Sequence, residues 1–113
     1  MLGKDKRLRH NKDFIRVLKQ GKRHYNGGVL LYYRPNDLEY SRLGFIVGKK
    51  YSLLAVRRNK QRRIFQSVAK ELYPQLNPGF DIIISYTNRD KVLPYKSAQR
   101  ILKELFEQAN LLF

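Results

Sequence analysis

The chain has 113 residues, the length of one domain, and its 24 Lys and Arg against 9 Asp and Glu give a formal net charge of +15 at pH 7. Hydrophobic residues make up 42%, enough for one modest core, which excludes disorder throughout. The lack of Cys excludes disulfide scaffolds, Cys-ligated zinc and thiol nucleophiles. No apolar run could span a membrane, and residues 1–9 lack the apolar stretch of a secretory signal. We therefore expect a cytoplasmic protein with no membrane partner, and nucleic acid is the first candidate partner.

The positive charge is concentrated in two segments. Residues 1–27 hold nine basic and two acidic side chains, whereas residues 49–63 hold seven basic side chains and no acidic one. Because soluble surfaces usually mix the two signs, we interpret these segments as binding surfaces for a polyanion. A solvated charged face is the alternative.

Hydrophobic periodicity and turn residues predict one α+β domain over residues 1–113. The expected elements, in chain order, are a helix over 11–21 with Asn11 as N-cap, strands over 29–34 and 41–48, a helix over 58–73, a strand over 80–86 and a helix over 97–113. Residues 49–56 fit either a short strand or a crossover loop. Residues 1–10 are expected to be a mobile basic arm, and His24 is expected to lie in a basic connector. This order predicts a two-layer α/β sandwich with three helices against one face of a sheet of about four strands.

The most specific feature is the basic run at the start of the predicted second helix. Asn59, Arg62 and Arg63 fall opposite the apolar stripe of this helix, so they should face outward. Arg57 and Arg58 lie near its N-terminus, where the helix dipole disfavours cations. A phosphate bound by the free N–H groups and by Arg would compensate for that cost. The alternative is that Arg58 and Asn59 only cap and pack the helix.

Alternation in the strand over 29–34 predicts two different faces. The more apolar set should face the core, and it consists of Val29, Leu31 and Tyr33. Leu30, Tyr32 and Arg34 would then line the opposite face, where bases of single-stranded nucleic acid could stack on Tyr32. Tyr32 as an ordinary strand residue is the alternative.

We find no catalytic constellation in the sequence. The nine carboxylates are scattered, and neither His has metal-ligand spacing, so no metal site is expected. His10 and His24 could perform acid–base cleavage of RNA, but we favour phosphate contact or a surface role for both. The sequence therefore predicts a binding surface without catalytic residues.

The basic run also resembles the signature of the bacterial ribonuclease P protein subunit. That signature has two Lys, a short spacer, Ala-Val, one residue, then Arg-Asn-Arg and a basic pair, and the chain has Lys49-Lys50 followed by Ala55-Val56-Arg57-Arg58-Asn59-Lys60-Gln61-Arg62-Arg63. The flanks resemble the family as well, at Leu8, Asn11, Asp13, Phe14, Gly21, Arg42-Leu43-Gly44 and Asp81-Ile82-Ile83-Ile84. The similarity covers roughly residues 7–110.

The resemblance implies a fold and a function. The fold would contain a left-handed crossover at the basic helix, although parallel units are ordinarily right-handed. The function would be 5′ maturation of precursor tRNA by a ribonucleoprotein endoribonuclease. Its RNA subunit would do the chemistry, with magnesium bound mainly by the RNA and the substrate. The implied partners are the catalytic RNA and precursor tRNA, and no protein partner is required.

The resemblance also implies two sets of site residues. Contacts with the catalytic RNA would come from Lys49, Lys50, Arg57, Arg58, Asn59, Lys60, Arg62 and Arg63. The cleft that holds the single-stranded 5′ leader would contain Phe14, Leu18, Tyr32 and Arg34.

Several positions depart from the family pattern. Lys60 stands in place of Arg, which keeps the charge but loses the planar fork. The spacer over residues 51–54 is one residue longer than usual and lacks the common Gly. Leu18 replaces a frequent aromatic, Gln66 replaces a frequent basic residue, and Tyr86 takes the place of an expected Arg.

Three other functions share some of these features. The main alternative is a ribosomal or chaperone-type RNA-binding protein, which would confer no processing activity. A stand-alone ribonuclease would cut RNA without an RNA subunit and would depend on His10. An architectural DNA binder fits the charge but not the single-strand cleft.

Overall fold

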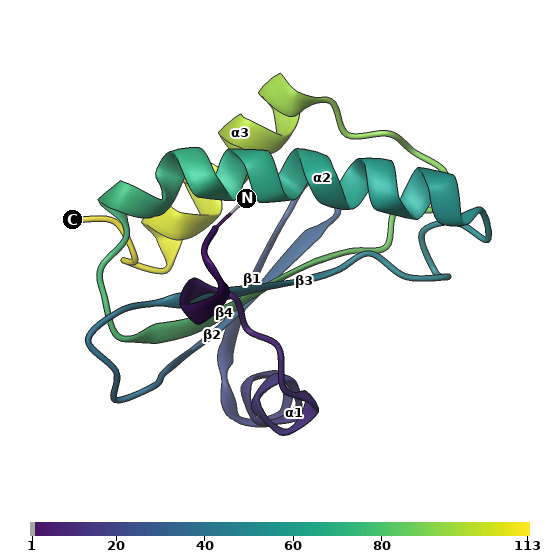
Figure 1. The fold of residues 1–113 in the computed structure, drawn as a ribbon. Coiled ribbons are helices and arrows are strands. Elements are labelled where there is room, and N and C mark those ends of the chain that lie inside the picture. The colour runs from purple at the N-terminus through teal and green to yellow at the C-terminus, as the bar shows by residue number, and fades with distance from the viewer. Residues whose placement is uncertain (1) are drawn as a thin grey trace.

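The computed structural model describes residues 2–113. Its elements are η1 (Lys4–Lys6), α1 (Asn11–Gln20), β1 (Lys22–Asn26), β2 (Val29–Pro35), β3 (Arg42–Ile46), α2 (Ala55–Leu72), η2 (Tyr73–Gln75), β4 (Phe80–Tyr86) and α3 (Tyr95–Gln108) (Figure 1). In this part of the chain, no helix is long and apolar enough to cross a membrane.

The four strands form one mixed sheet in the order β1-β2-β4-β3. The pairs β1–β2 and β2–β4 are antiparallel, whereas β3 and β4 are parallel. Parallel neighbours need a crossover connection, and α2 provides it. The α+β sandwich is thus confirmed, and the left hand of the crossover stays a prediction.

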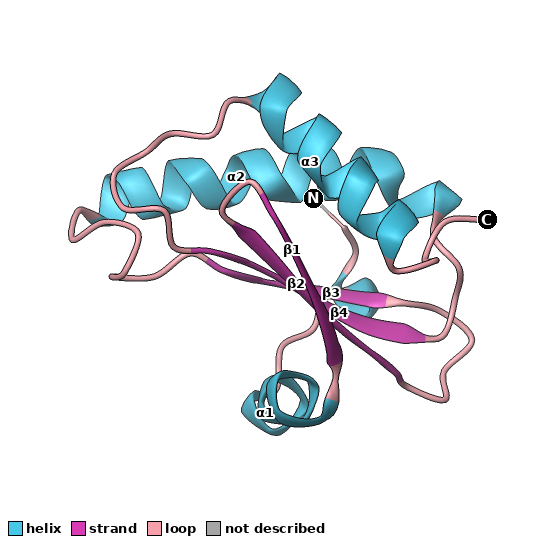
Figure 2. Cartoon of the chain, turned by 180° about the vertical axis from the view of Figure 1, so that it is seen from behind, coloured by secondary structure: helices cyan, strands magenta, loops and turns pink. Residues whose placement is uncertain are grey.

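Helices pack on both faces of the sheet, not on one face as the sequence suggested (Figures 1 and 2). The core face, which α2 and α3 cover, buries Val29, Leu31 and Ile84 completely. The α1 face, which carries α1 alone, buries a smaller cluster around Ile83, with Tyr32 only half-buried. The predicted alternation of β2 is therefore confirmed.

The segment expected to be a connector is an edge strand, β1. Its polar sequence lacks the alternation that marks a half-buried strand, so periodicity alone could not find it. The chain reverses through Gly27 and Gly28, whose positive φ values of 56° and 87° suit a tight hairpin turn. The turn then pairs β1 with β2 along its whole length.

Several helix boundaries differ from the prediction. The helix α2 begins at Ala55 and not at residue 58, so the basic residues from Arg57 to Arg63 lie within the helix, while Lys49 and Lys50 precede it. The helix α3 runs from Tyr95 to Gln108 and not over 97–113, because Asn110 adopts a positive φ of 56° and ends it. The strand predicted over 41–48 is also shorter, since β3 runs from Arg42 to Ile46.

The predicted mobile arm is docked on the domain, with Leu2 against the core cluster and the Lys6 Nζ 5.1 Å from the centroid of the Tyr73 ring. Arg7 forms a parallel bridge with Leu43, and the Leu8 N–H donates to the Leu43 carbonyl at 2.8 Å. Leu8 is only 5% exposed. His10, not Asn11, occupies the N-cap position of α1. Met1 lies outside the described residues.

Candidate nucleic-acid interface

An ion cluster joins α1 to the edge strand β3 and to its neighbour β4. The Arg42 guanidinium donates two hydrogen bonds to the Asp81 carboxylate, at 2.8 and 2.7 Å, and its Nη1 lies 3.6 Å from the Asp13 carboxylate. The hydrogen bond to Asp81 raises the pKa of Arg42. Both carboxylates are buried, so the cluster holds α1 in one position on the sheet. That position brings Phe14 over β3.

The contact between Phe14 and β3 requires a glycine. A Cβ atom on Gly44 would lie 2.5 Å from the Phe14 ring, closer than real side chains approach. Only glycine therefore lets the ring approach the strand this closely. The Arg42-Leu43-Gly44 run that resembles the family therefore has two local roles. Arg42 anchors α1, and Gly44 leaves room for the Phe14 ring.

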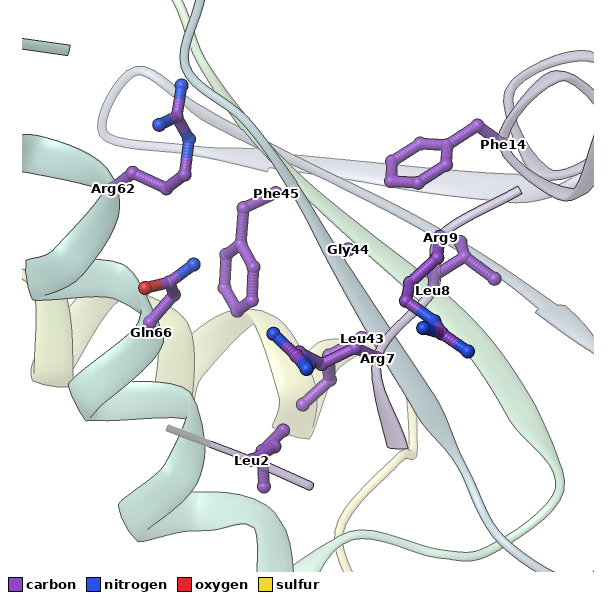
Figure 3. A pocket seen from close by; sticks show the side chains of 10 residues that line it. All are labelled: Leu2, Arg7, Leu8, Arg9, Phe14, Leu43, Gly44, Phe45, Arg62 and Gln66. Atoms are coloured by element: carbon purple, nitrogen blue, oxygen red, sulfur yellow. The ribbon is translucent and has the colours of Figure 1, made fainter. Parts of the chain in front are cut away.

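A cavity of about 220 Å³ opens beside the edge of β3, between the N-terminal segment and α2 (Figure 3). Its walls mix apolar rings with cations, and they consist of Leu2, Arg7, Leu8, Arg9, Phe14, Leu43, Gly44, Phe45, Arg62 and Gln66. Aromatic surface beside guanidinium groups suits a nucleotide, because bases stack on rings and Arg binds phosphate.

Of two neighbouring arginines of the basic run, Arg62 lines this cavity and Arg63 does not. Arg62 bends toward β3, where its guanidinium donates to the Val47 carbonyl at 3.0 Å and to the Asn59 Oδ1 at 2.8 Å. Figure 3 shows Arg62 and Gln66 on the α2 wall of the cavity. Arg63 is exposed on the outside of the helix. The equal outward placement predicted for the two arginines is therefore wrong for Arg62, because a carbonyl within reach captures it.

The opposite flank of α2 carries a buried glutamine that sequence analysis missed. The Gln61 side chain donates to the Leu93 carbonyl at 3.0 Å and accepts from the Leu93 N–H at 2.9 Å. The Tyr51 hydroxyl lies 3.4 Å from its Oε1. Gln61 thus ties two loops to α2. Its spacing of four residues before Phe65 was the available signal, but its polar character placed it with the basic run.

The loop before α2 is tightly packed at one end and exposed at the other. Tyr51 and Ser52 are buried, and the Asp90 N–H donates to the Tyr51 carbonyl at 2.7 Å. Arg58 donates to the Ser52 carbonyl at 3.1 Å, so this arginine contributes to the packing of the helix start. Arg57 lies 3.4 Å from Asp90 in an exposed ion pair.

The remaining cations of the basic run point to solvent. Lys49, Lys50, Lys60 and Arg63 are exposed, and none has a side-chain hydrogen bond or ion pair within residues 2–113. Cations left without partners on one surface favour binding of a polyanion. Asn59 is also exposed, with its Oδ1 held by Arg62.

The four residues expected in the leader-binding cleft lie in three places. Phe14 and Tyr32 pack against the same small cluster on the α1 face. Leu18 lies one turn after Phe14 on α1 and is 39% exposed. Arg34 lies at the end of β2, where it lines a separate hollow with Lys22 and other residues. The structure thus groups Phe14 with Tyr32, while Arg34, on the same face of β2, lines a different hollow.

The two histidines are not brought together. His24 stacks on Tyr33 with ring centroids 5.8 Å apart, on the core face of the sheet. His10 stands at the start of α1, on the other face. An acid–base pair needs both groups within reach of one proton-transfer site, and this arrangement does not provide it. In the described part of the chain, no three His, Asp or Glu side chains gather in a way that could hold a metal ion.

Comparisons with known proteins agree with this architecture. The family description Ribonuclease P matches residues 2–110. A Ribonuclease P protein component from Synechocystis sp. is 35% identical over 112 residues, which cover 98% of this chain and 90% of that protein. The protein of the same name from Thermotoga maritima is 37% identical over 78 residues, or 69% of this chain and 66% of that one.

Solved structures give the same result. A Staphylococcus aureus RNase P protein mutant with defective mRNA degradation activity has a TM-score of 0.86 at 28% identity, over 96% of this chain and 92% of that chain. The RNase P protein from Thermotoga maritima has a TM-score of 0.78 at 30% identity, over 90% of this chain and 96% of that one. Sequence and fold therefore match along nearly the whole chain.

Proposed function

The chain belongs to the ribonuclease P protein family, and on this premise we propose that it binds both the catalytic RNA and the 5′ leader of precursor tRNA. It is the protein component of a bacterial ribonucleoprotein and part of an endoribonuclease holoenzyme. The observation that carries the proposal is an arrangement of two surfaces. Unpartnered cations lie along α2 and just before it, on one side of the sheet, and the aromatic pair Phe14 and Tyr32 lies on the other side.

The catalytic RNA binds to the outer surface of α2. Four exposed cations there form no ion pair with an acidic side chain of the described residues, and they are Lys49, Lys50, Lys60 and Arg63. Arg57 forms an exposed ion pair with Asp90. Phosphates displace counterions from such a surface, which gives affinity that falls steeply with salt. Free N–H groups at the start of α2 add a dipole of the right sign.

The 5′ leader binds on the α1 face, in contact with Phe14 and Tyr32. Both rings are half-buried, so each is held in place and still presents part of its surface. Bases of a single strand stack on such rings with little sequence preference, as a general leader site requires. Arg62 lies between the two surfaces and could contact either RNA.

The RNA subunit performs the cleavage, with magnesium held mainly by the RNA and the substrate. The residues present do not fit a magnesium site, because no carboxylate cluster is available in the described part of the chain. The protein contributes positive charge where two polyanions approach each other, which lowers their repulsion. We place this assembly in the cytoplasm.

Cleavage of a precursor tRNA at low magnesium tests the function. The substrate is incubated with a bacterial ribonuclease P RNA, with the protein, or with both. Cleavage at the mature 5′ end only when both are present supports the proposal. Equal cleavage with and without the protein would favour the alternative of an RNA-binding protein without a processing role.

The arm with protein alone has a second purpose. One similar structure is that of a Staphylococcus aureus RNase P protein mutant with defective mRNA degradation activity. The protein is therefore also incubated alone with an mRNA. Cleavage by the protein alone that disappears in His10→Ala would support a stand-alone nuclease instead.

A further inference from the structure

The edge strand β1 presents two different sets of side chains. Toward the core face, His24 stacks on Tyr33, and its Nε2 lies 3.4 Å from the Tyr33 hydroxyl. Toward the α1 face, Arg23 and Tyr25 are exposed, Tyr25 by 66%. Neither has a side-chain hydrogen bond, ion pair or ring contact with any other described residue.

The register of the sheet places this pair beside the aromatic cluster of the α1 face. Arg23 is the cross-strand partner of Tyr32, and Tyr25 is the partner of Leu30. Tyr25 is therefore the diagonal neighbour of Tyr32, a separation of roughly 7–8 Å that aromatic side chains can bridge. Arg23 and Tyr25 thus continue the surface that contains Phe14 and Tyr32.

The direction of α1 shows which end of that surface they extend. The helix begins near β3, because Leu8 pairs with Leu43, and it ends beside β1, because only Gly21 separates Gln20 from Lys22. Phe14 lies at the β3 end, where it contacts Gly44. Leu18 follows one turn later, toward β2 and β1. The end of the surface that lacks an aromatic on α1 is therefore the end at which Tyr25 stands.

We propose that Arg23 and Tyr25 form a further nucleotide-binding position, in which one base of the 5′ leader stacks on Tyr25 and the adjoining phosphate pairs with Arg23. This inference rests on the proposed function of the α1 face as the leader site. The ligand is single-stranded RNA, namely the part of the leader that extends beyond the nucleotide bound at Tyr32. A single exposed tyrosine would need no function, but here an unpartnered ring, an unpartnered guanidinium and an aromatic surface are contiguous.

The test is substrate affinity of the reconstituted holoenzyme for precursor tRNAs that differ only in leader length. Tyr25→Ala should weaken binding of long-leader substrate by about five-fold or more, the effect of one lost stacked base. Binding of substrate with the shortest leader should not change, because that leader does not reach β1. Tyr25→Phe should restore the affinity, since it keeps the ring.

Two controls locate the effect. His24→Ala removes an aromatic ring from the same strand but from the core face, so it should leave the dependence on leader length unchanged. Arg23→Gln should reduce the salt slope of long-leader binding by about 0.7, the value for one phosphate contact on a single strand. Thermal melting of each variant checks that the fold is retained.

The outcomes separate this inference from the proposed function. If Tyr32→Ala weakens leader binding and Tyr25→Ala does not, the extension is wrong and the leader site stands. If neither variant affects leader binding, the leader site itself is wrong. If Tyr25→Ala instead weakens assembly of the protein with the catalytic RNA, whatever the leader length of the substrate, Tyr25 contacts that RNA and the inference is overturned.

Discussion

The two faces of the sheet are made from alternate residues of the same strands, yet they differ in how completely they are covered. On the core face, Ile82 and Ile84 are fully buried beneath α2 and α3. On the α1 face, Ile83 is equally buried, but Tyr32 and Ile46 beside it remain half-exposed. A single ten-residue helix cannot cover a four-stranded sheet, so part of the face stays accessible. Stability is thus concentrated on the core face, whereas the α1 face leaves aromatic surface accessible.

The largest expected effect is on the free energy of unfolding, when Phe65 on the core face is replaced. This residue of α2 is fully buried on the core face, where its ring packs edge-on against Tyr86 with centroids 5.5 Å apart. Phe65→Ala should reduce the free energy of unfolding by about 3–5 kcal/mol. Urea unfolding followed by circular dichroism measures it. A loss below 1 kcal/mol, on the order of an exposed-site substitution, would contradict the assignment of stability to this face.

The next effect is expected at the cluster that holds α1. Arg42→Met leaves the Asp13 and Asp81 carboxylates without their guanidinium, and breaking a buried ion pair costs about 3 kcal/mol. Because α1 would lose its anchor, leader-dependent binding should fall while binding of the catalytic RNA changes little. Unfolding and both affinities are measured on one preparation. Equal loss of the two affinities would mean that Arg42 supports the whole fold and not α1 in particular.

Tyr32→Ala should have a smaller effect on stability than Phe65→Ala and a specific effect on binding. Loss of one base–aromatic stack should cost about 1–3 kcal/mol in leader binding. Affinity for the catalytic RNA should be unchanged, because α2 lies on the other face of the sheet. Equilibrium binding with leadered and leaderless substrate tests this. A loss of catalytic-RNA affinity of the same size would argue against two separate surfaces.

Arg63→Ala is the reverse experiment. The exposed guanidinium should contribute one phosphate contact, so its removal should lower the salt slope for catalytic-RNA binding by about 0.9 and leave leader dependence intact. Arg62→Ala is the matched comparison, since Arg62 turns toward β3. Identical behaviour of the two variants would show that the bend of Arg62 has no consequence for RNA binding.

The smallest effect concerns alkaline pH. Burial raises the pKa of Tyr86 above its ordinary value of 10.0. Above about pH 10 the unfolded chain therefore binds fewer protons at this phenol than the folded chain, and stability falls as pH rises. Tyr86→Phe loses the hydrogen bond to the Lys91 carbonyl, worth about 1 kcal/mol at neutral pH. The gap between the two proteins should narrow above pH 10 in urea titrations, and a constant gap would contradict the pKa shift.

Sequence reasoning succeeded where a residue's character and its spacing agreed. The three helices, the strands β2, β3 and β4 and the alternation of β2 agree with the prediction, because burial of one face imposes its own period. Reasoning failed where the two disagreed. The polar strand β1 and the buried amide of Gln61 both owe their state to partners elsewhere in the chain.

The sequence by itself determined the α+β class, the surplus of cations and the family, since each depends on composition or on residues close together in the chain. Only the tertiary structure decided the arrangement of the site. It turned Arg62 inward and Arg63 outward, grouped Phe14 with Tyr32, and placed Arg34 in the lining of a separate hollow. It also placed Arg23 and Tyr25 beside Tyr32. The physical reason is that orientation depends on which carbonyl, ring or carboxylate lies within hydrogen-bonding or packing distance, and those neighbours come from distant parts of the chain.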